Sequence, residues 1–352
     1  MSHREITFAQ GVREALAEAL AEDPRVYVMG EGVPDPKGIF GTTLGLAAEF
    51  GSERVLDMPL AENGMTGVAI GSALAGMRPV LTHQRVDFAL LAMDQMVNNA
   101  AKWHYMFGGQ LSVPLVIRLV IGRGWGQGPQ HSQSLQAWFA HVPGLKVVMP
   151  TTPSDAKGLL LSSIRDDNPV IFLEHRWLHN VRGHVPEGGY EVPLGRARVA
   201  RPGRDLTIVS TSYSTLEALH AADWLAAIGV EAEIIDVRTL RPLDTDTILA
   251  SVRKTGRLIA ADTGWGFCGF SAEIVAFVTQ EAFPSLKAAP RRVAMPDHPA
   301  PTSHALAQHY YPGPFDLFQA ACAVMEIPPD RDRPGRSSTQ LDVPDRAFTG
   351  PF

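Results

Sequence analysis

Apolar runs alternate along the chain with segments whose apolar positions recur at helical spacing. Residues 7–22 carry apolar side chains at positions 12, 15, 16, 19 and 20, which predicts a helix capped by Thr7. The same pattern predicts further helices at 64–75, 93–106 and 155–165. Short apolar runs predict buried strands at 26–29, 79–81, 114–121, 146–149 and 170–173. This alternation favours a mostly parallel sheet covered by helices.

A second unit of the same kind follows a break in the pattern. Between His175 and Pro202 the sequence turns to glycine, proline and charged residues, which marks a domain boundary. Beyond it, strand-like runs at 206–209, 232–237 and 258–261 alternate with helical patterns at 215–227 and 245–253. We therefore expect an α/β protein with two parallel-sheet domains. Residues 1–185 form the first domain, 186–327 the second, and 328–352 an extended or disordered tail.

Composition and charge exclude several classes of function. The 352 residues carry a net charge of −6 with no long basic run, which argues against nucleic-acid binding. No stretch approaches the ~18 uninterrupted apolar residues of a membrane span, and because MSHREITFAQ lacks the apolar core of a signal peptide, we expect none. Cys268 and Cys322 are too few for a disulfide framework. A cytoplasmic protein is the expectation.

Glu62 is the first candidate for chemistry. It lies between the end of an apolar run and a helix rich in small residues, which includes Gly64, Gly67 and Gly71. Open α/β sheets bind ligands at the carboxyl ends of their strands, so this carboxylate is placed to meet a ligand. The alternative is a solvated glutamate favoured by the helix dipole. The glycines permit close packing against another element or subunit.

His131 is the second candidate. It ends a stretch with four glycines, Gly122 to Gly128, directly after a strongly apolar strand. The stretch lacks the spacing and the lysine of a phosphate-binding P-loop. A loop histidine can transfer protons, although it is more often a structural residue held by hydrogen bonds. His141, His175 and His179 have no partners at a recognisable metal-ligand spacing, and we expect them to be structural.

Several strings resemble one family. They are PLAENGMTGVAIGSALAGMRPV, DFALLAMDQMVNNAAKWHYM, GPQHSQSLQAWFAHVPGLKVVMP and AKGLLLSSIRDDNPVIFLEH. In this order they closely resemble the beta subunit of the decarboxylating component of 2-oxo acid dehydrogenase complexes, and the similarity covers about residues 5 to 325. The resemblance implies a thiamine diphosphate enzyme with a pyrimidine-binding domain followed by a transketolase C-terminal-type domain.

The resemblance also implies roles for particular side chains. Glu62 would hydrogen-bond N1′ of the cofactor aminopyrimidine, and Phe88 would lie against that ring or serve only as a core residue. His131 would serve proton transfer or reception of the acyl-carrying lipoyl arm. A structural potassium ion would bind through Asp166 and Asn168, with backbone carbonyls near Leu115, Ser163 and Ile164.

Partners follow from a missing motif. Relatives hold the diphosphate and magnesium on a domain with a Gly-Asp-Gly motif, and no such string occurs in this sequence. The resemblance therefore implies an alpha subunit that binds magnesium, in an α2β2 heterotetramer. It also implies decarboxylation of a 2-oxo acid, of pyruvate or branched-chain type, with transfer of the acyl group to a lipoyl carrier and possible docking to a lipoyl acyltransferase core.

Other interpretations remain. Arg85 stands close to the expected pocket, where many relatives have no cation, and it would meet a substrate carboxylate or pair with Asp87. This departure keeps open a split transketolase-like carboligase or an acetoin dehydrogenase subunit. A non-catalytic scaffold subunit is the alternative from a different class.

Overall fold

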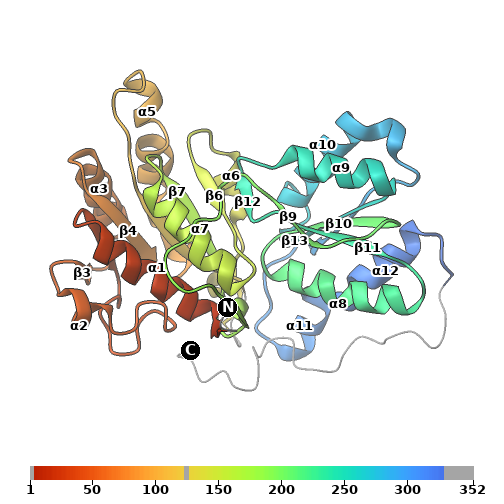
Figure 1. Cartoon of the computed structure of the whole chain (residues 1–352), viewed down its shortest axis with the longest axis horizontal. Coiled ribbons are helices and arrows are strands. Elements are labelled where there is room, and N and C mark those ends of the chain that lie inside the picture. Colours follow the sequence, from red (N-terminus) through yellow and green to blue (C-terminus); the bar gives the residue numbers. More distant parts are fainter. Residues whose placement is uncertain (1–3, 123–126, 329–352) are drawn as a thin grey trace.

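A computed structural model describes residues 4–122 and 127–328. The two predicted domains lie side by side, each built on its own sheet (Figure 1). The α/β architecture with two mostly parallel sheets is confirmed. The predicted tail lies outside the described residues, apart from Pro328. Within the described ranges, no helix is both long and apolar enough to span a bilayer.

The first sheet has seven strands in the order β12-β6-β7-β5-β4-β2-β3. Six are parallel, and β12 joins the edge antiparallel to β6. The strands are β2 (Val26–Gly30), β3 (Val55–Leu56), β4 (Arg78–His83), β5 (Val116–Ile121), β6 (Lys146–Val148), β7 (Val170–His175) and β12 (Thr239–Arg241). β12 comes from the second half of the chain, so that half supplies the edge strand of the first sheet (Figure 1).

Helices cover both faces of this sheet. On one face α1 (Phe8–Glu22) packs against α7 (Pro153–Arg165), and Thr7 caps α1 as predicted through a capping box with Gln10. The remaining helices of this half are α2 (Leu46–Phe50), α3 (Glu62–Leu74), α4 (Val86–Ala89), α5 (Trp103–Met106) and α6 (Gln136–His141). A two-stranded antiparallel sheet joins β1 (Glu5–Thr7) to β8 (Arg182–His184).

The helix predicted at 93–106 is interrupted. A 3₁₀ turn (Leu90–Ala92) and a π-helix (Gln95–Ala100) precede the short α5. The π-helix contains Asn98 and Asn99, which have low helix propensity, and their amides donate to the side chains of Asp94 and Gln95 one turn earlier. The apolar period alone could not distinguish this widened helix from a regular one.

The second sheet has five strands in the order β14-β13-β10-β11-β9. Its strands are β9 (Arg198–Arg201), β10 (Leu206–Ser210), β11 (Ala232–Asp236), β13 (Leu258–Trp265) and β14 (Arg291–Met295). Only β9 runs antiparallel to its neighbour. The helices of this second half of the chain are α8 (Tyr213–Ala227), α9 (Thr245–Thr255), α10 (Phe270–Ala282), α11 (His304–Tyr310) and α12 (Pro314–Val324).

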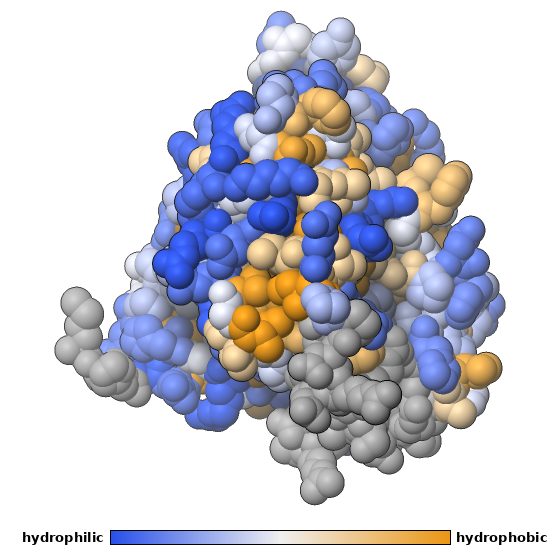
Figure 2. All heavy atoms as spheres, turned by 90° about the vertical axis from the view of Figure 1, so that its right-hand side faces the viewer, coloured by the Kyte–Doolittle hydropathy of each residue, from blue (hydrophilic) through white to orange (hydrophobic). Residues whose placement is uncertain are grey.

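The apolar core is continuous between the two sheets. One cluster of buried side chains includes Ala69 of α3 and Leu119 of β5, and it extends to Ile248 of α9 and Ile274 of α10. A separate cluster packs α8 and α12 against the other face of the second sheet. Figure 2 shows the outer side of the second domain, where apolar side chains gather among polar ones. The shared core fixes the position of the loops that leave the first sheet.

Candidate active site at the carboxyl edge of the first sheet

Four neighbouring strands of the first sheet bring the predicted residues to one edge. Glu31 follows β2, Asp57 follows β3 and Glu62 begins α3. Phe88 lies in α4 just after β4, and His131 lies in the segment that follows β5. Because β5, β4, β2 and β3 are adjacent and parallel, their carboxyl ends meet at the same side of the sheet. This is where an open α/β sheet binds ligands.

Glu62 is a mostly buried residue whose carboxylate oxygens keep some contact with solvent. It lies in the first turn of α3, where the helix dipole favours negative charge, and only 8% of the residue is exposed. Within the described part of the chain, no side chain or backbone group forms a hydrogen bond or an ion pair with its carboxylate. The carboxylate is therefore free, within the described residues, to accept a hydrogen bond from a group outside them.

Glu31 is a second acidic group that the sequence analysis missed. Burial and the negative charges of Glu62 and Asp57 raise the pKa of the Glu31 carboxyl. Its Oε1 is buried without a hydrogen-bond partner among the described residues. Asp57, by contrast, accepts hydrogen bonds from the backbone N–H groups of Gly32 and Met58 at 2.9 and 3.0 Å. The position of Glu31, directly after a predicted strand, was the available signal.

Phe88 and His131 contact each other. Their ring centroids lie 5.3 Å apart, and the rings meet edge to face at 77°. Phe88 is 41% exposed, so it is not the core phenylalanine of the alternative interpretation. His131 is half-buried in a 3₁₀ turn, Pro129–His131. The pair therefore combines a partly open aromatic surface with a titratable ring.

The base of the segment that presents His131 is closed by hydrogen bonds. The N–H of Gly122 donates to the carbonyl of Gln133 at 3.1 Å, and the Gln133 amide donates to Asp87 at 2.8 Å. Gly122 has a φ of +81°, and a Cβ there would lie 2.3 Å from Nε2 of His175. Only glycine fits this position.

Arg85 pairs with Asp87, which is one of the two alternatives left by the sequence. Its Nε lies 3.6 Å from Oδ2 of Asp87, and only 3% of the arginine side chain is exposed. The guanidinium therefore does not extend into an open pocket.

The predicted potassium ligands meet at one turn, where the protein's own cations also lie. The carboxylate of Asp166 pairs with Lys146 and accepts hydrogen bonds from the backbone and side-chain amides of Asn168. The carbonyls of Ile164 and Asp166 each accept a hydrogen bond from Arg78 at 3.1 Å. The carbonyl of Leu115 accepts from the N–H of Val170, and the hydroxyl of Ser163 donates to the carbonyl of Leu159. A potassium ion at this turn stays a prediction.

His179 packs within the first domain, whereas His175 packs against α8 of the second. His179 lies 3.2 Å from Glu174, which pairs with Arg118 through two contacts of 2.6 and 3.0 Å. Arg118 and Glu174 are fully buried. Desolvation raises the pKa of Glu174, but the charge of Arg118 together with the hydrogen bonds from His179 and Arg118 outweighs it and lowers the pKa to about 2. His175 stacks on Tyr213. Within the described ranges, no group of three or more His, Cys, Asp or Glu side chains is arranged to hold a metal ion.

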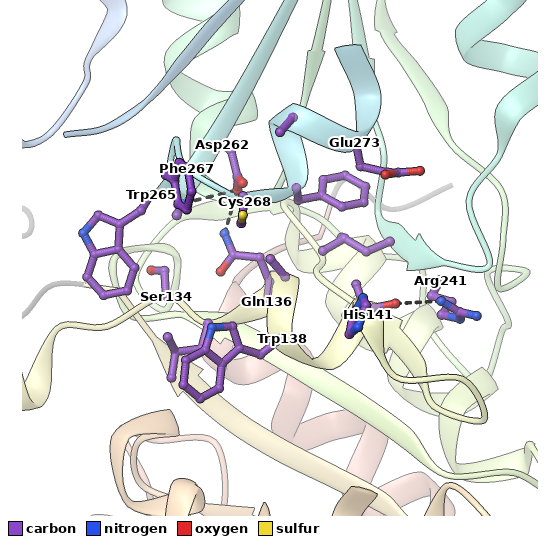
Figure 3. Close-up of a pocket in the computed structure, with 18 of the residues that line it drawn as sticks. Ser134, Gln136, Trp138, His141, Arg241, Asp262, Trp265, Phe267, Cys268 and Glu273 are labelled. Carbon is purple, nitrogen blue, oxygen red and sulfur yellow. Dashed lines mark hydrogen bonds between the residues drawn. The ribbon is translucent and has the colours of Figure 1, made fainter. Parts of the chain in front are cut away.

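A cavity of about 1220 Å³ lies between the domains, separate from the candidate site described above. Figure 3 shows it between α6, the end of β12 and the start of α10, with Trp138, Trp265 and Phe267 among its lining side chains. Nε2 of Gln136 donates to Asp262 at 2.6 Å and joins the two domains across it. Glu62, Phe88 and His131 do not line this cavity.

Two family models match the chain. The transketolase pyrimidine binding domain matches residues 4–181, and the transketolase C-terminal domain matches residues 195–316. The first match contains Glu31, Glu62, Phe88 and His131, and therefore all the candidate residues at the carboxyl ends of the first sheet's strands.

Curated relatives align over most of the chain. The beta subunit of an acetoin:2,6-dichlorophenolindophenol oxidoreductase from Cupriavidus necator is 44% identical and covers 92% of this chain and 98% of its own. A pyruvate dehydrogenase E1 component subunit beta from Rickettsia felis is 43% identical, with 91% and 98% covered. A mitochondrial pyruvate dehydrogenase E1 subunit beta-2 from Oryza sativa is 42% identical, with 90% and 86% covered.

Among solved structures, a split gene transketolase, described as an inactive beta4 tetramer, matches with a TM-score of 0.75. It covers 92% of this chain and 99% of its own, but at 22% identity it supports the fold alone. The identity and coverage of the curated relatives carry the assignment further. The chain belongs to the family of pyruvate dehydrogenase E1 and acetoin oxidoreductase beta subunits, which combines a transketolase pyrimidine binding domain with a transketolase C-terminal domain.

Proposed function

We propose that this chain is the beta subunit of a thiamine diphosphate-dependent 2-oxo acid dehydrogenase. The enzyme decarboxylates a 2-oxo acid, of pyruvate or branched-chain type, and passes the acyl group to a lipoyl carrier. The observation that carries the proposal is the Glu62 carboxylate, which is buried, unpaired among the described residues, and located at the ligand-binding edge of a sheet in a chain of this family.

The residues at this edge fit an aminopyrimidine ring. A ring nitrogen that carries a proton is the kind of donor that the Glu62 carboxylate lacks, and Glu31 adds a buried oxygen without a donor behind it. The partly exposed ring of Phe88 offers a surface for stacking. Glu62 and Phe88 would therefore hold the pyrimidine.

Two side chains of this chain would handle protons. When bound, thiamine diphosphate supplies the carbon nucleophile and the electron sink that decarboxylation of a 2-oxo acid requires. Glu62 would hold the proton at N1′ of the pyrimidine and share it, which an amide could not do. His131, beside Phe88, would hold or deliver a proton where substrate reacts, or receive the lipoyl arm.

The outer face of α3 supports an alpha partner. Gly64, Val68, Gly71 and Ala75 form an exposed stripe of mostly small residues, and no atom lies within 4 Å of a Cβ built at Gly64 or Gly71. Glycine in an exposed helix costs about 1 kcal/mol relative to alanine, and no close-packed neighbour among residues 4–122 and 127–328 justifies that cost. The exposed Leu60 precedes this helix, and the exposed Leu91 lies in the 3₁₀ turn that packs against α3. We place the alpha subunit on this stripe.

The alpha subunit would complete the cofactor site in an α2β2 assembly. It would hold the diphosphate and magnesium, because no Gly-Asp-Gly string occurs here. A lipoyl acyltransferase core would be a further partner. Potassium would bind at the Asp166 turn through oxygen lone pairs that Lys146 and Arg78 do not use. Equal melting temperatures in potassium chloride and in choline chloride at the same ionic strength would exclude that ion.

Acetoin cleavage is the second candidate function, because a relative at 44% identity is a subunit of an acetoin oxidoreductase. The test is to co-purify the chain with its alpha subunit and supply thiamine diphosphate and magnesium. Formation of acyl-lipoyl carrier from a 2-oxo acid supports the dehydrogenase. Reduction of dichlorophenolindophenol with acetoin alone supports the second candidate. If calorimetry detects no binding of thiamine diphosphate to the complex, both fail and the scaffold alternative stands.

A further inference from the structure

Arg85 is a buried cation that the proposed chemistry does not use. It precedes the short helix α4 at the end of β4, and 3% of its side chain is exposed. Burial lowers the pKa of its guanidinium, and the negative charge of Asp87 opposes that effect. Burying a charge is costly unless it is paired and hydrogen-bonded, so the contacts of Arg85 indicate what it does.

The guanidinium joins two separate points of the segment that leads to His131. Nη2 donates to the carbonyl of Gly122 at 2.6 Å, and Nη1 donates to Oε1 of Gln127 at 2.9 Å. Gly122 directly follows β5, and Gln127 lies four residues before His131. The planar fork of arginine can bind two acceptors at once, which the single ammonium of lysine cannot reproduce at the same geometry.

Two residues close to Arg85 in sequence, one acidic and one aromatic, contact the rest of the same segment. Asp87 neutralises Arg85 at 3.6 Å and accepts the amide of Gln133 at 2.8 Å. Phe88 contacts the ring of His131. Residues 85–88 therefore contact the segment before, at and after the histidine.

We propose that Arg85 is a positioning residue that sets the place of His131 through Gly122 and Gln127, and that it does not bind the substrate carboxylate. Nη1 and Nη2 donate to the protein, Nε faces the Asp87 carboxylate, and only 3% of the side chain is exposed, so the guanidinium is not presented to an anion in solvent. The inference rests on the proposed function only in assigning His131 to the reaction. The contacts of Arg85 with Gly122 and Gln127 are a property of this chain, whatever the reaction.

The experiment compares Arg85→Met with Arg85→Lys in the complex with the alpha subunit, with Arg204→Met as the matched control because the Arg204 side chain is 72% exposed. Hydrogen exchange at the backbone amides of residues 127–133 measures the attachment. Steady-state kinetics in the presence and absence of His131→Ala measure whether Arg85 acts through the histidine.

We expect Arg85→Met to accelerate exchange at 127–133 at least tenfold and to lower kcat at least tenfold, with KM for the 2-oxo acid changed less than threefold. Arg85→Lys should resemble it, because it keeps the charge but loses the two-point contact. In the His131→Ala background, Arg85→Met should change kcat less than twofold.

Unchanged exchange at 127–133 would overturn the proposal. So would a tenfold rise in KM that Arg85→Lys restores and that persists in the His131→Ala background, since that pattern identifies a substrate contact. A wild-type complex without decarboxylase activity would reject the proposed function instead, and the exchange measurement would still test the attachment.

Discussion

Glu62 combines two properties that a helix-start glutamate rarely has together. The helix dipole favours its charge and the residue is only 8% exposed, yet no described group of this chain forms a hydrogen bond or an ion pair with its carboxylate. The neighbouring Glu31 is held under the same conditions, and its pKa is raised. Such an arrangement is unfavourable in the isolated chain and becomes favourable when a donor arrives, as expected for a ligand site.

Substitution of His131 tests whether this side chain transfers a proton in the reaction. We predict that His131→Gln lowers kcat about a hundredfold or more, because the amide keeps the size and hydrogen bonding of the ring but cannot titrate. Calorimetry should find the affinity for thiamine diphosphate within threefold of wild type, since the histidine contacts Phe88 rather than Glu62 in the described structure. His220→Gln on the exposed face of α8 is the control. Turnover within twofold of wild type would reject this role.

The sequence reaches some of these residues and not others. The sequence pattern placed Glu62 at a strand-to-helix junction and His131 at the end of a glycine-rich stretch, and the resemblance added Phe88. The role of Arg85 could not be predicted, because its acceptors are a backbone carbonyl 37 residues away and an amide 42 residues away. Glu31 was missed because a single acidic residue after a strand is common, and only burial and the neighbouring charges distinguish it.

At the scale of elements, α3 has an outer face that no described residue covers closely at Gly64 or Gly71. Apolar periodicity predicted this helix within two residues at its start and one at its end, since it covers Glu62–Leu74. Its exposed glycines, however, have meaning only in three dimensions, where the space above Gly64 and Gly71 is open. The same periodicity could not predict the π-helix that packs against α3, because backbone widening leaves the apolar pattern intact.

A bulky residue on α3 separates folding from assembly. We predict that Gly71→Leu leaves the melting temperature of the isolated chain unchanged or higher, because leucine is favoured over glycine in a helix by about 0.8 kcal/mol and meets no atom there. Affinity for the alpha subunit should fall at least tenfold, because the side chain occupies the contact surface. Ala226→Leu, at an exposed position of α8, is the control for association measured by analytical ultracentrifugation. Normal association of Gly71→Leu would place the alpha subunit elsewhere.

At the scale of the whole molecule, the two domains are joined by more than the connecting chain. β12 completes the first sheet, Gln136 bonds to Asp262, and Arg198 pairs with both Asp155 of α7 and Asp236 of β11. The alternation of strands and helices predicted both sheets but not β12, since a three-residue strand paired across the domains has no local signature. These links fix the position of the first sheet, which carries Glu62, relative to the second domain.

Asp236 makes this junction sensitive to pH. Burial and the negative charge of Asp155 outweigh Arg198 and raise the pKa of Asp236 from 3.8 to about 7. A raised pKa in the folded state means that the stability contributed by the protonated form is complete below about pH 4 and is lost as pH rises through about 7.

We predict that wild type loses unfolding free energy relative to Asp236→Asn between about pH 4 and pH 7, by an amount on the order of a few kcal/mol. The difference should be flat above pH 8, where both states of the wild type are ionised. Urea denaturation of both proteins across this range provides the measurement. A difference that does not vary with pH would show that Asp236 stays ionised throughout.

The central claim is that Glu62 of this chain activates a cofactor shared with another subunit. Its most direct test is the rate at which the C2 proton of thiamine diphosphate exchanges with deuterium in the complex of wild type or Glu62→Gln with the alpha subunit and magnesium. The account predicts that wild type accelerates this exchange and that Glu62→Gln loses about a hundredfold or more of the rate while the complex stays assembled. Exchange in Glu62→Gln as fast as in wild type would contradict the account.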